Sequence, residues 1–232
     1  MGATDQQRGE KAAAELRAHG LPAEFLNIDV TSQTSVDVAG SEVEARHGRL
    51  DVLVNNTGMA MDLRPGSELT MDVLQKTFET NVFGVFCVIK AMLPLLRKTE
   101  HARIVNMTSG NGSFTFYANP QVRLPDRNTL LAYSSSKAAL DMITLRLANE
   151  LSGAGIKVNA ADPGLTATEM NQYRGRGTVE EGAAMPVRLA LLPDDGPTGR
   201  VFDNGVRNRG DVARHPASTR GGAWKGSHSL RQ

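Results

Sequence analysis

Two residues four positions apart, Tyr133 and Lys137, are the strongest candidates for chemistry in this sequence. On a helix they lie on one face, about one turn from each other. A nearby ammonium group favours the phenolate and lowers the pKa of a tyrosine, which can then donate a proton to a carbonyl oxygen or remove one from an alcohol. Taken alone, the pair is better interpreted as two surface residues of an amphipathic helix, because such a spacing arises easily by chance.

Two further polar residues change the weight of that interpretation. Ser109 follows the strand-like run Arg103–Met107, where a hydroxyl can bind a substrate oxygen and stabilise developing charge. The alternative for Ser109 is a turn or helix-capping serine. Asn81 interrupts an otherwise apolar helical stretch, and a buried amide needs hydrogen-bond partners. Asn81 is therefore either the ligand of a proton-relaying water or a satisfied core amide.

Helical and strand patterns alternate along the chain, which predicts an α/β fold with a doubly wound parallel sheet and helices on both faces. Ligands of such sheets bind beyond the carboxyl ends of the strands, so the chemistry is expected just after Asp29, Val54, Met107 and Ala160. The expected helices are Arg8–His19, Val36–His47, Met71–Arg97 and Leu131–Leu151, and the expected strands are Glu24–Val30, Leu50–Val54, Arg103–Met107 and Ile156–Ala160.

The composition excludes several classes of protein. A net charge of +1 over 232 residues argues against nucleic acid as a partner. Cys87 is the single cysteine and the five histidines lack ligand spacing, so we expect no disulfide, no metal site and a cytoplasmic location. The most apolar window, Val82–Leu96, is shorter than a membrane span and contains Lys90 and Pro94, which favours a buried helix and no membrane.

The composition shifts once along the chain, after Gly205. Residues 206–232 carry six Arg or Lys against one acidic residue, Asp211, and lose hydrophobic periodicity. Such a segment cannot bury enough apolar surface to fold, so we expect a disordered basic tail. The organisation predicted is one domain over residues 1–205 and a tail over 206–232.

Together these residues resemble the short-chain dehydrogenase/reductase family, from about Gly2 to Phe202. Asn81, Ser109, Tyr133 and Lys137 match the family's catalytic tetrad in identity and order. The resemblance implies that Tyr133 is the general acid/base, that Lys137 lowers its pKa and holds the nicotinamide ribose, that Ser109 orients the substrate oxygen and that Asn81 holds the relay water.

Three further segments resemble cofactor-binding motifs of the family. Asn55–Gly58 is similar to its Asn-Asn-Ala-Gly element, with Thr57 in place of Ala, and Pro163–Thr168 resembles the loop at the nicotinamide carboxamide and pyrophosphate. Asp29–Val30 resembles the pair that meets the adenine ring. The cofactor-binding residues implied are Asp29, Val30, Asn55, Gly58, Tyr133, Lys137, Pro163, Thr166 and Thr168.

The reaction implied is hydride transfer between NADP or NAD and a small carbonyl or secondary alcohol. The segment around Phe114–Asn128 looks like an insertion of carbonyl-reductase-like members, which favours reduction of a ketone or aldehyde. The helices Met71–Arg97 and Leu131–Leu151 resemble those through which the family forms dimers and tetramers. A homodimer or homotetramer is therefore expected.

The start of the sequence departs from the family pattern. Complete members begin with a strand and a turn of the type Thr-Gly-x-x-x-Gly-x-Gly, whereas Gly2–Asp5 looks like the end of the second strand. We therefore expect a fold lacking the first strand, the glycine-rich turn and most of the second strand, so that the strand around Phe25 cannot pair beside Leu53. Without that turn, no helix N-terminus is expected to bind the pyrophosphate.

Cofactor choice and activity stay open at the level of sequence. Thr4 takes the place where NADP-binding relatives often carry Arg, and Asp5 is one position late for an NAD-specific acid. One interpretation is an NAD(P)-dependent reductase. The other is a truncated, catalytically silent paralogue that acts only as an interaction or structural protein, and weak cofactor binding is the expectation for the chain as written.

Overall fold

The computed structural model describes residues 1–119 and 128–203. Its described strands form two separate parallel sheets, one of four strands in the order β3-β4-β5-β6 and one of two strands, β1-β2. This confirms the predicted α/β, Rossmann-like architecture. The strands are β1 (Gly2–Ala3), β2 (Leu26–Asn27), β3 (Val52–Asn55), β4 (Arg103–Met107), β5 (Lys157–Asp162) and β6 (Val201–Asp203).

From β1 to β5, the long helices connect the strands in the order expected from sequence. The predicted helix Met71–Arg97 is interrupted by a π-helical turn, η2 (Glu79–Gly84). The α-helices are α1 (Gln6–Ala18), α2 (Gln33–His47), α3 (Met71–Phe78), α4 (Val85–Leu96), α5 (Phe114–Ala118), α6 (Leu131–Leu151) and α7 (Val179–Ala190). Short 3-10 turns are η1 (Gly66–Glu68), η3 (Gly110–Gly112), η4 (Ser152–Ala154) and η5 (Glu169–Asn171).

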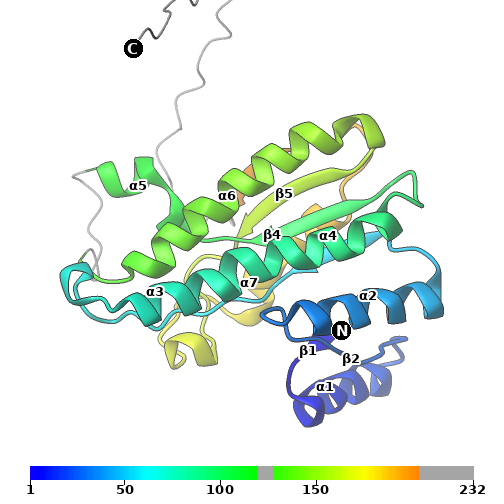
Figure 1. Cartoon of the computed structure of the whole chain (residues 1–232), viewed down its shortest axis with the longest axis horizontal. Helices are drawn as coiled ribbons and strands as arrows, with labels where there is room; N and C mark the ends of the chain where they lie inside the picture. The colour runs from blue at the N-terminus through cyan, green and yellow to red at the C-terminus, as the bar shows by residue number, and fades with distance from the viewer. Residues whose placement is uncertain (120–127, 204–232) are drawn as a thin grey trace, which may run out of the picture.

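Alternating side chains of the four-stranded sheet divide the core into two layers, as the two-residue period of a strand requires. Ile104 and Val158 point into the larger cluster, formed with α2, α4 and α6. Val105 and Ala161 point to the opposite face, where they pack against Leu189 of α7. Figure 1 shows α4 and α6 crossing one face of the sheet and α7 behind it.

The stretch Met71–Leu96 is, by length and composition alone, long and apolar enough to cross a membrane. Half of its most apolar window is buried inside the protein. Val85, Ile89 and Leu96 are almost fully buried and belong to the larger core cluster. The apolar content of this stretch is thus used by the core of the described fold.

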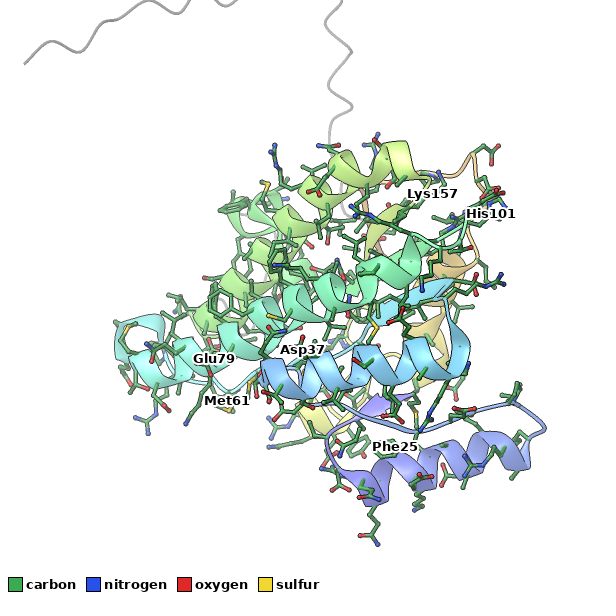
Figure 2. The ribbon with its side chains drawn as sticks, turned by 45° about the vertical axis from the view of Figure 1, so that its right-hand side comes forward. Phe25, Asp37, Met61, Glu79, His101 and Lys157 are labelled. Atoms are coloured by element: carbon green, nitrogen blue, oxygen red, sulfur yellow. The ribbon has the colours of Figure 1, made fainter. Side chains whose placement is uncertain are left out.

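The β1-β2 pair and α1 form a small unit beside the four-stranded sheet, at the lower right of Figure 1. Phe25, labelled in this unit in Figure 2, packs so closely on Gly9 that a Cβ there would lie 2.2 Å from its ring. As expected, β2 does not pair with β3. Among the described residues no strand pairs with the outer edge of β3, and Val54 on that strand is 44% exposed.

The parallel strands place all their carboxyl ends on one side of the molecule. Figure 2 shows this polarity: His101 and Lys157, where β4 and β5 begin, lie at one end, whereas Met61 and Glu79 lie at the other. The basic tail predicted over 206–232 lies outside the described residues, and so does most of the predicted insertion, of which Phe114–Asn119 and Asn128 are described.

Candidate active site

The carboxyl end of β4 and the first turns of α6 bring three of the predicted residues together. The Ser109 hydroxyl lies beside the Tyr133 phenol, near enough to lower its pKa, and it accepts a hydrogen bond of 3.2 Å from the Asn111 N–H. The Lys137 Nζ atom lies 5.7 Å from the centre of the Tyr133 ring. The helical spacing therefore places the ammonium group against the ring, while the serine meets the phenol.

Lys137 is anchored at the end of β4 by a hydrogen bond of its amine. Its Nζ donates a hydrogen bond of 2.8 Å to the Met107 carbonyl oxygen at the end of β4. Its side chain is only 3% exposed, and this burial lowers the pKa of Lys137 to about 8, with the Asp141 carboxylate acting in the opposite direction. The amine is therefore close to its titration point near neutral pH.

The expected lowering of the Tyr133 pKa is wrong for this structure. Burial raises the pKa of Tyr133 to about 12, the Ser109 hydrogen bond lowers it and the Asp162 carboxylate raises it further. Removing a phenolate from water costs more than one hydroxyl donor returns. Although part of the side chain reaches solvent, Tyr133 is thus a protonated phenol at neutral pH.

Asn81 lies fully buried in the π turn and links the loop after β3 to α6. Its Oδ1 accepts a hydrogen bond of 2.8 Å from the Met59 N–H. Its Nδ2 donates one hydrogen bond of 2.9 Å to the Met59 carbonyl and another of 3.0 Å to the Ser136 hydroxyl. Ser136 in turn donates 2.7 Å to the Tyr133 carbonyl. These bonds use both amide N–H groups, as a satisfied core amide would, and leave one lone pair on Oδ1.

The two ends of the Asn55–Gly58 segment have different surroundings: Asn55 is buried among neighbouring elements, and Gly58 lies next to Lys137 and Asn81. Asn55 donates 2.9 Å to the Asn106 side chain, which donates 2.8 Å to the Thr144 hydroxyl of α6. A Cβ at Gly58 would lie 3.3 Å from Lys137 Nζ and 3.7 Å from Asn81 Oδ1. Gly58 therefore brings bare backbone close to the catalytic candidates, whereas the Asn55 side chain ties β3, β4 and α6 together.

Asp29 and Val30 lie at the carboxyl end of β2, next to the π turn. The Asp29 carboxylate accepts bonds of 2.9 and 2.7 Å from the Thr31 N–H and hydroxyl. A Cβ at Gly84 would lie 2.7 Å from the Val30 carbonyl oxygen. Val30 is therefore packed against the same turn that carries Asn81.

Pro163, Thr166 and Thr168 lie in the loop that follows β5. The Thr166 hydroxyl donates 3.2 Å to the Pro163 carbonyl, and Thr168 precedes the short turn η5. Met170 of η5 reaches Gly58, because its methyl carbon would lie 3.8 Å from a Cβ placed there. This loop thus covers the tetrad side of the Asn55–Gly58 segment.

Two buried acids near the site were not predicted from sequence. Asp162, at the end of β5, accepts 3.0 Å from the Gly164 N–H and influences Tyr133; its position directly before Pro163–Gly164 was an available signal. Asp62 accepts 2.6 Å from the Ala132 N–H at the start of α6. No sequence pattern marks Asp62, because its partner lies far along the chain.

A parallel sheet with a Ser–Tyr–Lys cluster at the carboxyl ends of its strands defines a Rossmann-like oxidoreductase. The family model of the short chain dehydrogenases matches residues 2–178, and the chain belongs to that family. It is 33% identical to short-chain dehydrogenase/reductase 1 of Saponaria officinalis, over 85% of this chain and 83% of the relative. It is 30% identical to carbonyl reductase (NADPH) 3 of Mus musculus, over 83% and 81% of the two chains.

The solved structures show the same relationship. Salutaridine reductase from Papaver somniferum superimposes with a TM-score of 0.75 at 26% identity, covering 87% of this chain and 89% of that one. The sequence-based assignment to the short-chain dehydrogenase/reductase family, including its likeness to carbonyl reductases, is confirmed.

Proposed function

We propose that this family member is an NAD(P)-dependent enzyme that reduces a small ketone or aldehyde or, in the reverse direction, catalyses the oxidation of a secondary alcohol. The observation that carries the proposal is the position of the Tyr133 phenol, with the Ser109 hydroxyl beside it and Lys137 Nζ 5.7 Å from the ring centre. A phenol with a pKa near 12 stays protonated at neutral pH, which is the form that reduction of a carbonyl requires.

Each side chain has a distinct task in this proposal. Tyr133 gives its hydroxyl proton to the substrate oxygen as that oxygen gains negative charge, and Ser109 donates a hydrogen bond to the same atom. Lys137, anchored on the Met107 carbonyl, keeps a positive charge beside the phenol when protonated. Asn81 fixes the position of α6 through Ser136 and offers its remaining lone pair to a relay water.

The residues present fit a nicotinamide dinucleotide, which would supply or accept the hydride. Gly58 fits because it brings backbone, without a Cβ, to the Lys137 ammonium. Asp29 and Val30 would hold the adenine end, while Pro163, Thr166 and Thr168 would hold the nicotinamide end. The NADPH named for the carbonyl reductase of Mus musculus supports NADP as the first cofactor to test, with NAD as the second.

A matched pair of tyrosine variants tests this function. Purified full-length protein is assayed with NADPH and NADH on cyclic ketones and aromatic aldehydes. Tyr133→Phe should lower kcat by about 10²- to 10⁴-fold, the range of a lost general acid. Tyr117→Phe is the control. The Tyr117 hydroxyl of α5 lies 3.2 Å from the hydroxyl of Ser134, which is on α6 next to Tyr133, but Tyr117 is not part of the tetrad. Equal turnover by wild type and Tyr133→Phe contradicts the proposal.

A catalytically silent interaction or structural protein is the second candidate. Two observations support this second candidate: no Thr-Gly-x-x-x-Gly-x-Gly segment occurs in the given sequence, and no described strand covers the outer edge of β3. Backbone N–H groups of such a turn normally receive the pyrophosphate. Titration with NADPH and NADH by fluorescence separates the candidates: weak binding and no turnover support the silent protein, and micromolar binding with turnover supports the reductase.

Assembly and location complete the proposal. Phe83 is 57% exposed and Phe86 39% exposed on the η2–α4 stretch, and Met142 and Leu145 are 57% and 41% exposed on α6. Apolar side chains exposed on neighbouring helices favour a homodimer or homotetramer through this face. Analytical ultracentrifugation showing a monomer contradicts that assembly. The single cysteine, Cys87, favours a cytoplasmic location.

A further inference from the structure

We infer that Asp62 is a positioning residue of the active site, which caps the N-terminus of α6 from another part of the chain and thereby fixes Tyr133. Asp62 lies in the loop after β3, and α6 carries Tyr133 and Lys137. This inference rests on the proposed function for its catalytic consequence, while the capping contact is a feature of the fold.

The start of α6 has no cap of its own. Its N-cap residue is Leu130, an apolar residue in the left-handed region with φ 60°, and it makes no side-chain capping bond. The first N–H groups of a helix have no partner within the helix. Asp62 supplies two acceptors. Its Oδ2 accepts a hydrogen bond of 2.6 Å from the Ala132 N–H, and its backbone carbonyl accepts one of 3.0 Å from the Leu130 N–H.

Asp62 is buried, and the N-terminus of α6 compensates its carboxylate. The residue is only 3% exposed, and within residues 1–119 and 128–203 its second oxygen, Oδ1, has no hydrogen-bond partner. An isolated buried carboxylate is costly. The described contact that compensates is the positive end of the α6 dipole, which a carboxylate at a helix N-terminus stabilises. Asp62 and the start of α6 are therefore coupled.

A second contact holds the same loop against the same helix. The Gly66 N–H donates 3.2 Å to the Asn128 carbonyl. A Cβ at Gly66 would lie 2.5 Å from a methyl carbon of Leu131, so the loop backbone touches the first turn of α6 directly. Tyr133 follows Ala132 in the chain, and loss of the cap would therefore loosen the turn that aims the phenol at Ser109.

Three variants of the full-length protein test the inference: Asp62→Ala, Asp62→Asn and Asp5→Ala. The asparagine keeps an acceptor for the Ala132 N–H. Asp5 makes the same kind of cap on α1, with 2.9 Å to the Arg8 N–H, but α1 carries no tetrad residue. Well below the unfolding temperature, Asp62→Ala should lower kcat about 10- to 100-fold, since small misplacement of a catalytic group costs that much. Asp62→Asn should restore most of the rate, and Asp5→Ala should leave it unchanged.

Tyr133 ionisation gives a readout that loss of stability alone would not move. Ultraviolet difference titration, with Tyr133→Phe as the reference, follows this phenol in folded protein. In Asp62→Ala water reaches the loosened turn, so the phenol should titrate closer to the ordinary value of 10.0 than to about 12. In Asp62→Asn it should titrate as in wild type.

The outcomes separate the two proposals. A wild type without turnover contradicts the reductase, and the titration still decides the role of Asp62. An active wild type with an Asp62→Ala variant equal to it in kcat and in Tyr133 titration overturns the inference. Equal losses in Asp62→Asn and Asp62→Ala, tracking reduced unfolding temperature only, also overturn it.

Discussion

The four-stranded sheet with its helices and the small β1-β2-α1 unit differ in how firmly they are packed. Helix α6 buries seven residues, among them Leu140, Thr144 and Leu151, whereas α1 buries only Gly9 and Ala13. The capped start of α1 carries no chemistry, and the start of α6 carries Tyr133. The catalytic candidates thus lie in the part of the molecule with the deepest core.

The difference separates two ends of the proposed cofactor site. Ser109, Tyr133 and Lys137 are held by β4 and α6, while Asp29 follows β2 in the small unit. Leu26, Ile28 and Val30 of this segment are only partly buried, and they pack against the larger core cluster. Near the site the unit adds the exposed pair Arg8–Glu169 at 4.0 Å, and exposed pairs contribute little stability. The chemistry end therefore lies on elements with fully buried side chains, and the adenine end lies on elements whose side chains are partly buried.

Truncating one leucine in each region should test this comparison most clearly. Leu140 on α6 is fully buried, and Leu140→Ala should lower the free energy of unfolding by about 2–5 kcal/mol, the cost of a core cavity. Leu16 on α1 is 38% exposed, and Leu16→Ala should cost about 0.5 kcal/mol or less. Urea unfolding of both variants measures the two values, and equal losses would show that the regions are equally packed.

The buried amine of Lys137 makes stability depend on pH. Between its folded pKa of about 8 and the ordinary value of 10.5 the unfolded chain binds more protons, so the free energy of unfolding should rise with pH. The full rise is on the order of 3 kcal/mol. Above 10.0 the raised pKa of Tyr133 acts in the opposite direction, because the folded state then holds the extra proton.

Lys137→Met provides the matched measurement for that interval. Urea unfolding at several pH values should give a rising curve for wild type and a flat one for the variant. Lys11 is a suitable control, because it lies exposed on α1 and Lys11→Met leaves the buried amine in place. A wild-type curve that is flat between the two pKa values would mean that Lys137 is hydrated in the folded protein.

The smallest effect is expected at the cap of α1. Asp5 accepts bonds from the Arg8 N–H and guanidinium, and the backbone contact lowers the pKa of its carboxyl. Asp5→Ala should speed hydrogen exchange of the α1 amides and leave exchange in β4 and α6 unchanged. Exchange that rises throughout the four-stranded sheet would show that the two regions unfold together.

Much of the fold was predictable because its signals are local. The bounds of β4 and α6 agree with the sequence patterns, since buried parallel strands form apolar runs and α6 continues one helical pattern. Helix α7 and strand β6 were not predicted as elements, although Thr178 and Glu181 form a capping box at the start of α7. The strand predicted over Glu24–Val30 is only Leu26–Asn27, because its one described partner is the two-residue β1.

The site was predictable only where its residues belong to motifs. Ser109, Tyr133 and Lys137 follow a recognisable order, and the structure gathers them. The hydrogen bonds that Asn81 accepts from the Met59 N–H and that Asp62 accepts from the Ala132 N–H join distant segments, so no spacing reveals them. The pKa of Tyr133 also depends on burial, which cannot be predicted from the presence of Lys137 four positions later in the sequence.

The π turn at Glu79–Gly84 divides one long helix into two differently oriented faces. A π turn corresponds to one residue inserted into an α-helix, so side chains beyond it are rotated relative to those before it. Here α3 meets α6, whereas α4 meets α2. Deleting one residue from this turn would restore a regular helix and put one of these two faces out of phase with its partner. The π turn thus sets the rotation of α4 relative to α3, and the length of residues 79–84 should tolerate neither gain nor loss.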